Sequence, residues 1–177
     1  MGTLQGATAG RGANVRIDAW LVLVATLAIW VTIGAAREEG ARDADLLAYV
    51  IGAAVAAPLL VRRRWPVGAL VCSALILQLY FTVNYPAITV AVPLAIATYS
   101  AAVAGHARAA ATIAGGLELL GFLYRTRIEN ESLVSALGIG TVTDVALLAC
   151  VILLAELVRS RRALQAATRE RMRVLER

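Results

Sequence analysis

Residue types that most metal sites and disulfide frameworks need are scarce in this chain. It has one histidine, two cysteines and no lysine, because all 17 basic residues are arginines. His106 has no second histidine and no cluster of cysteines or carboxylates nearby in the sequence, so we interpret it as a solvated loop residue. Cys72 and Cys150 both fall inside apolar runs, where we interpret them as small core residues. A disulfide framework has no support.

Catalytic motifs are also lacking. The sequence has no Gly-rich phosphate loop, no nucleophile elbow and no metal-ligand spacing. We therefore expect no catalytic residue, no cofactor and no metal site within these residues. Nothing indicates binding to nucleic acid.

Charged side chains make up only 16% of the chain, and they gather in a few places instead of spreading along polar helix faces. Hydrophobic residues make up 60%, and the mean hydropathy is +0.74. This composition excludes an ordinary soluble domain and predicts a polytopic membrane protein. The lipid bilayer is thus the first partner that we expect.

Apolar runs near the length of a bilayer crossing recur along the chain, and backbone groups in lipid must be satisfied within a helix. The fold class that we predict is all-α, a transmembrane bundle of about six spans whose last helix extends into the cytoplasm. The predicted spans are 17–36, 46–61, 67–83, 87–104, 109–124 and 141–158. The second and fifth are the shortest. In the second, Gly52 and Ala56 lie one turn apart, which favours either close helix packing or merely an Ala-rich composition.

The arginines predict the orientation, since positive residues favour the cytoplasmic side. Without the tail, six arginines fall on the amino-terminal side of the membrane and four on the other. The six are Arg11, Arg16, Arg62, Arg63, Arg64 and Arg108, and the four are Arg37, Arg42, Arg125 and Arg127. We predict a bacterial plasma-membrane protein with both termini cytoplasmic. Its parts are a polar segment (1–16), a sensor domain (17–158) and a juxtamembrane linker helix (159–177).

Three acidic residues lie within apolar runs, where a charge costs on the order of 2.5–3.5 kcal/mol. Glu118 is the most deeply placed, and it is either a proton-sensitive sensing group or a hydrogen-bonded structural residue. Asp144 lies one turn inside the sixth span and is the second candidate for sensing, or a partner of Arg125 or Arg127. Glu156 lies three residues before Arg159 and reads as an interface residue.

The end of the chain contains neither Gly nor Pro from Thr141 to Arg177. One unbroken helix of this length would measure about 55 Å, of which roughly 25 Å would project beyond the bilayer. A seven-residue period runs along it, with arginine and threonine between its leucines, so it predicts only a weak coiled-coil seam. The leucines of this signal-transmission seam are Leu154, Leu157, Leu164 and Leu175. The alternative is a basic helix that lies on anionic lipid.

Several stretches in this order resemble the membrane-sensing region of actinobacterial-type two-component sensor histidine kinases. They are "RRRWPV", "LQLYFTVNYP", "VPLAIATYSAA" and "LLAELVRSRRALQAATRERMRVLER", between about Asp18 and Arg177. The resemblance implies a homodimeric sensor whose linker feeds a phosphate-acceptor domain and an ATP-binding domain. Those domains are absent from this chain, so ATP, Mg²⁺ and a response regulator are expected only through them.

The leading hypothesis is thus a sensory and dimerisation module that passes a signal through its last helix. Two hypotheses from other classes stay open. One is a small transporter or channel subunit that uses Glu118 as its pathway residue, although no inverted repeat is evident. The other is a membrane adaptor that binds a cytoplasmic partner through its basic tail.

Overall fold

The chain folds as a bundle of helices. The computed structural model describes residues 3–36, 42–86, 88, 91–127 and 138–175, with side chains from 16–36, 42–86, 88, 94–127 and 138–172. Within those residues the structure is all-helical and contains no strand. The predicted all-α class is therefore confirmed.

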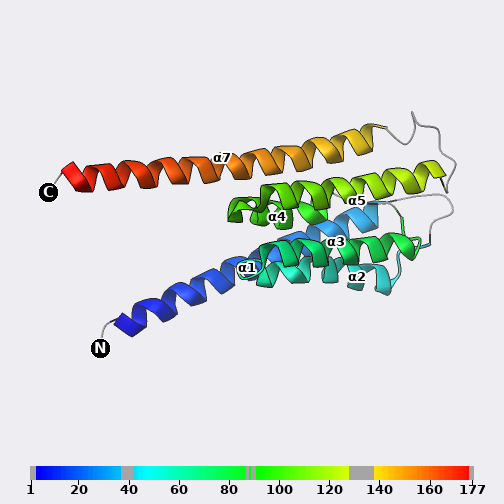
Figure 1. Ribbon diagram of the computed structural model, residues 1–177. Coiled ribbons are helices and arrows are strands. Elements are labelled where there is room, and N and C mark those ends of the chain that lie inside the picture. Colours follow the sequence, from blue (N-terminus) through cyan, green and yellow to red (C-terminus); the bar gives the residue numbers. More distant parts are fainter. Residues whose placement is uncertain (1–2, 37–41, 87, 89–90, 128–137, 176–177) are drawn as a thin grey trace.

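Figure 1 shows the helices lying roughly side by side along one direction. Their bounds are α1 (Thr3–Ala35), α2 (Leu46–Ala56), α3 (Pro66–Thr82), α4 (Ala91–Ala101), α5 (Ala107–Arg127) and α7 (Ile139–Leu175). A 3₁₀ turn, η1 (Ala57–Val61), continues α2, and a wide π-type turn, η2 (Ala102–His106), continues α4. Both termini project from one end of the bundle, which we name the terminal end (Figure 1). The opposite end is the loop end.

Local sequence explains several helix boundaries. Asp45 caps α2, because its carboxylate accepts a hydrogen bond from the Ala48 amide at 3.1 Å. Pro66 opens α3, where its missing amide hydrogen is not needed. Between α4 and α5, Gly105 has a φ of 94°, a left-handed conformation that glycine adopts at little cost. The polypeptide can therefore reverse direction sharply at the end of α4.

Helix α4 lies at the centre of the packing, because it contacts α1, α3, α5 and α7. Its inward side chains are mostly small: Ala97 and Ala101 are fully buried, and Ala102 in η2 is as well. Small side chains allow helix backbones to approach closely. Larger buried residues, such as Leu94 and Tyr80, fill the spaces between the helices.

Close packing also joins α1 to α2. A Cβ atom on Gly52 would lie 2.9 Å from Cδ1 of Ile33 and 3.0 Å from Cγ2 of Ile29, so any side chain here would make an isoleucine methyl group move. Ala56, one turn later, is fully buried. The close-packing interpretation of this pair is confirmed. Trp30 adds to the contact by donating a hydrogen bond to the carbonyl oxygen of Tyr49 at 2.9 Å.

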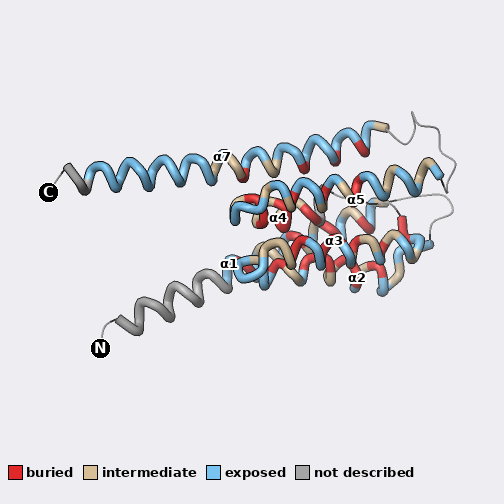
Figure 2. The backbone as a smooth tube through the Cα atoms, viewed as in Figure 1, coloured by how far each residue is buried: buried red, intermediate tan, exposed pale blue. Residues whose placement is uncertain are grey.

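Helix α7 is unbroken for 37 residues, as the absence of Gly and Pro predicts. Its first half packs against α4, η2 and α5. Beyond Val158, every described side chain is exposed, and Figure 2 shows this half of α7 standing clear of the bundle. The helix therefore joins a packed part to a solvent-exposed rod.

The described residues of the predicted spans are helical except Ala36, Val83 and Ile88, but membrane crossing is a stricter criterion. Two helical stretches are long and apolar enough to cross a bilayer, Arg16–Ala35 and Ile139–Met172. The stretches Leu46–Val61 and Pro66–Thr82 are apolar but shorter. The chain is thus compatible with a membrane location.

The interpretation of the two cysteines as core residues is wrong. Cys72 on α3 and Cys150 on α7 are both free and exposed. An apolar run in a membrane-type helix has two sides, and only one of them faces the other helices. Arg37, the start of the fourth predicted span and most of the loop that follows Arg127 lie outside the described residues.

Candidate functional site

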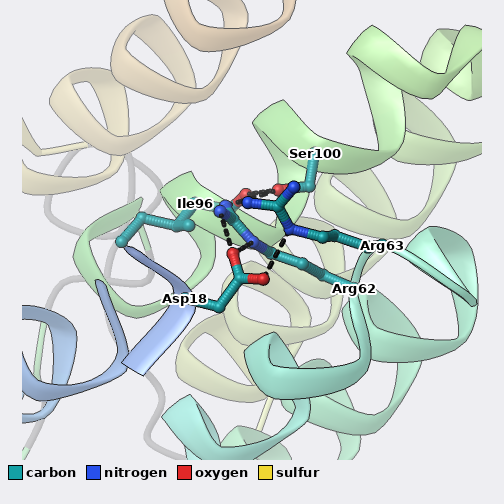
Figure 3. A network of polar contacts seen from close by, with 5 residues as sticks. All are labelled: Asp18, Arg62, Arg63, Ile96 and Ser100. Carbon is teal, nitrogen blue, oxygen red and sulfur yellow. Dashed lines mark hydrogen bonds and ion pairs between the residues drawn. The ribbon is translucent and has the colours of Figure 1, made fainter. Parts of the chain in front are cut away.

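A buried ion-pair network joins three parts of the chain at the terminal end (Figure 3). Asp18 of α1 lies at its centre, with its side chain only 7% exposed. The guanidinium of Arg62, just after η1, donates to Oδ1 of Asp18 at 2.8 Å, and Arg63 donates to Oδ2 at 2.5 Å. Arg62 also donates to Oγ of Ser100 on α4 at 3.1 Å. The Asp18 carboxylate thus joins α1 to the α2–α3 turn, and Arg62 links that turn to α4.

The two arginines differ in surroundings. The side chain of Arg62 is 14% exposed, whereas that of Arg63 is 48% exposed. Charge-assisted bonds to a desolvated pair are stronger than those to a solvated one. Arg62 is therefore the main structural partner of Asp18, and Arg63 keeps part of its charge at the surface.

This network was not foreseen from the sequence. Asp18 and Arg62 are 44 residues apart, so no local spacing connects them. The available signal was an acid placed at the very start of an apolar run. Such a residue needs a cationic partner, and "RRR" after the second run supplies one.

A second polar cluster closes the loop end. Tyr85 donates a hydrogen bond to Oδ1 of Asp45 at 2.6 Å, and Arg42 donates to Oδ2 at 2.7 Å. The Arg42 guanidinium also lies 5.3 Å from the centre of the Tyr85 ring. The hydrogen bond from Tyr85, together with the contacts of Ala48 and Arg42, lowers the pKa of the Asp45 carboxyl from its usual value. Desolvation, reinforced by the bond to Asp45, raises the pKa of the Tyr85 hydroxyl.

The two candidate sensing residues lie on two helices that contact each other. Glu118 on α5 and Asp144 on α7 are both buried, at 7% and 6% exposed, and they interact electrostatically across the contact between the two helices. Oε1 of Glu118 has no hydrogen-bond partner among the described residues. Arg125, two turns further along α5, is a weaker electrostatic neighbour of Glu118. The sequence placed each acid in a span but did not connect them, because they lie on different helices.

Helix α7 leaves the bundle beside the α4–α5 turn. A Cβ atom on Gly105 would lie 3.7 Å from Cζ of Arg159, so this guanidinium lies over the glycine backbone. Arg159 also donates to Glu156 at 3.3 Å, the helical charge pair that the spacing predicts. His106, next to Gly105, is exposed, as expected. Arg159 therefore lies against the α4–α5 turn where the exposed half of α7 begins.

The seam leucines face away from the bundle. Leu154, Leu157 and Leu164 are all exposed, whereas Ala155 is fully buried against the other helices. The side chain of Leu175 lies outside the described residues. An exposed apolar seam that continues from a packed helix is accessible to lipid or to a second chain.

These groups are held by ion pairs, hydrogen bonds and helix packing. Among the described residues, no three His, Cys, Asp or Glu side chains converge where they could hold a metal ion. Asp18 is paired with two arginines, and Glu118 has Asp144 as an electrostatic neighbour.

Comparison with family models gives a match over most of the chain. A family model described as a domain of unknown function, DUF7134, matches residues 8–162. No curated protein and no solved structure matches the chain. The matched residues include both polar clusters, the two buried acids and the first half of α7.

Proposed function

We propose that this chain, which belongs to the DUF7134 family of domains of unknown function, is the membrane sensory and dimerisation module of a two-component sensor histidine kinase. In this proposal a stimulus changes the packing of the bundle. Helix α7 then shifts or rotates and passes the change to a kinase domain. ATP, Mg²⁺ and the response regulator belong to that domain.

The observation that carries the proposal is the continuity of α7. The same helix contacts α4, η2 and α5 in its first half and is exposed in its second half. A rigid helix of 37 residues is about 55 Å long, so a displacement inside the bundle reaches its far end. A loop or a glycine in the middle would absorb such a displacement.

The proposal includes six crossings with both termini in the cytoplasm. Its support is the arginine distribution and the projection of both termini from the same end of the bundle (Figure 1). The shorter helices, such as Leu46–Val61, require local thinning of the bilayer or polar caps at their ends. The Asp18–Arg62 network and the Asp45–Tyr85 cluster lie near the two ends of that helix.

Pairing of two chains through the seam completes the mechanism. The seam is exposed in one chain, and its weak pattern of leucine and arginine is suited to a joint that changes state. Anionic lipid competes for the same basic face.

Cysteine cross-linking tests this pairing. Single substitutions Leu154→Cys, Leu157→Cys and Leu164→Cys are placed in a Cys72→Ser, Cys150→Ser background and oxidised in native membranes. We expect disulfide-linked dimers at these positions. Ala155→Cys is the matched control, because its side chain faces the bundle and should not link two chains. Absence of any cross-linked dimer at the seam positions would overturn the paired-linker model.

The kinase assignment has a separate test. The reading frame downstream of Arg177 should encode a helix with a phosphate-accepting histidine, followed by an ATP-binding domain. A stop codon directly after Arg177 would contradict a kinase in the same chain and favour the adaptor.

One observation favours a second function. Glu118 is buried, and one of its oxygens has no partner among the described residues, as is typical of a pathway residue in a small transporter. Ion or proton flux into proteoliposomes, abolished by Glu118→Gln, would support transport over sensing.

A further inference from the structure

The Glu118–Asp144 pair deserves a chemical reading of its own, because two buried acids meet across a helix interface. Each is more than nine-tenths buried, and they come from different helices, α5 and α7. Two carboxylates close together in a medium of low dielectric constant repel strongly, and they are stabilised when one proton is held between them. An unpartnered Glu118 oxygen leaves an acceptor for that proton.

Other charges near the pair do not neutralise it fully. Arg125 lies on the same helix as Glu118, two turns away, and no ion pair joins it to Glu118 among the described residues. Helices α3 and α4, which also pack against α5, contain no Asp, Glu, Lys or Arg. Their titratable groups are the exposed Cys72 and the tyrosines Tyr80 and Tyr99, while η2 brings only the exposed His106. A proton is therefore the simplest source of compensating charge.

The position of the pair gives the proton a mechanical role. Asp144 lies near the start of α7, on the same helix face as the buried Leu148 and Ala155. When the proton leaves for solvent, two negative charges remain between α5 and α7. Repulsion between them pushes the start of α7 away from the bundle, while the contact of Arg159 with Gly105 stays as a pivot at the terminal end.

We infer that Glu118 and Asp144 form a proton-binding site, holding one proton between them, and that its occupancy governs how closely α5 and α7 pack. The proton site stands on the geometry of the two acids. Only its consequence for signalling rests on the proposed function.

Infrared spectroscopy tests the site itself. The full chain in lipid nanodiscs is titrated between about pH 5 and pH 9, a range in which exposed carboxyls are already ionised or becoming so. We expect a protonated-carboxyl band that disappears at the alkaline end. Glu118→Gln removes the band. Asp144→Asn moves its disappearance to lower pH, because the repelling charge is gone.

The matched control is Glu156→Gln, which removes an exposed acid from α7 and should leave the band unchanged. Absence of a protonated-carboxyl band at every pH, as for a pair that holds a metal cation instead, overturns the inference. An unchanged titration in Asp144→Asn does so as well, because it shows two independent acids.

Spin labels on the native cysteines test the movement. Cys72 on α3 and Cys150 on α7 are free and exposed, so both take a label without a new substitution. Labelled chains are diluted with unlabelled Cys72→Ser, Cys150→Ser chains, so that distances are measured within one chain. We expect the distance distribution to change with pH in the wild type and in Glu156→Gln, but not in Glu118→Gln.

The two experiments separate the failures. A titrating band with a distance distribution that is the same at every pH overturns the mechanical half of the inference. Loss of cross-linking at the α7 seam overturns the proposed function and has no effect on the band.

Discussion

Asp18 is the residue at which the first helix is fixed to the rest of the bundle. Its carboxylate accepts hydrogen bonds from both Arg62 and Arg63, and Arg62 in turn reaches Ser100. Each of these groups alone would be costly to bury. Together they satisfy one another, so the network specifies the register of α1 against α4 as well as adding stability.

The neighbouring arginines provide a matched pair for testing this role. Arg62→Gln should lower the free energy of unfolding by about 2–4 kcal/mol, because it breaks a largely buried ion pair and leaves Asp18 undercompensated. Arg64→Gln removes the same charge from the same turn, but Arg64 is exposed, so it should cost less than about 1 kcal/mol. Tryptophan fluorescence during thermal unfolding in detergent measures both. Equal losses would show that charge at this turn, not the network, stabilises the fold.

The loop-end cluster predicts a pH dependence with two limits. Asp45 has a lowered pKa, so the stability it contributes is present above its unfolded value of about 4 and is lost as pH falls through the folded pKa. Tyr85 has a raised pKa, so its contribution is present below about 10 and is lost as pH rises through the folded pKa. When the unfolding temperature is measured as a function of pH, Asp45→Asn should reduce its fall at acid pH. Asp43 is exposed, so Asp43→Asn should leave that fall unchanged.

At the scale of helices, the α1–α2 contact depends on a missing side chain. Gly52 lies within van der Waals distance of Ile29 and Ile33, where a Cβ atom would already be too close. Helix propensity alone would favour almost any other residue at this position. The gain from close packing therefore exceeds the cost of glycine in a helix.

Enlarging this position should separate the two helices. Gly52→Leu should destabilise the protein by about 1–3 kcal/mol through overpacking. Gly115→Leu, in α5, is the control: nothing lies within 4 Å of a Cβ there, so the substitution should stabilise the helix by up to about 1 kcal/mol. Thermal unfolding of both variants in the same detergent gives the comparison. A neutral Gly52→Leu would show that α1 and α2 separate at little cost.

The sequence predicts the helices better than it predicts the contacts between them. The unbroken α7 is predictable because a run without Gly or Pro offers no place to stop, and the acids in the spans are visible as interruptions in apolar runs. That Glu118 and Asp144 lie on two contacting helices is not predictable, since spacing along one helix says nothing about the neighbouring helix. The exposure of Cys72 and Cys150 was missed for the same reason, because apolar runs do not show which side faces lipid.

At the scale of the whole molecule, the number of membrane crossings decides which surfaces meet the cytoplasm. If only the two long candidates, Arg16–Ala35 and Ile139–Met172, cross the bilayer, the termini still share one side, but everything between them lies on the other. If all the helical segments cross, the turn at Arg64 lies on the same side as the termini. The side of the membrane on which Arg64 lies therefore distinguishes the two arrangements, whereas the side on which the termini lie is the same in both.

Labelling with a membrane-impermeant maleimide resolves this, using exposed positions in a Cys72→Ser, Cys150→Ser background. We expect Asp43→Cys to react in intact cells, because the α1–α2 loop faces outward in both arrangements. Arg64→Cys should react only after lysis, as should Ser160→Cys in the tail, since three basic residues at that turn favour the cytoplasmic side. Reaction of Arg64→Cys in intact cells would contradict six crossings. It would also contradict the Asp18–Arg62 ion pair, because Asp18 lies at the start of the α1 crossing, on the side of the termini.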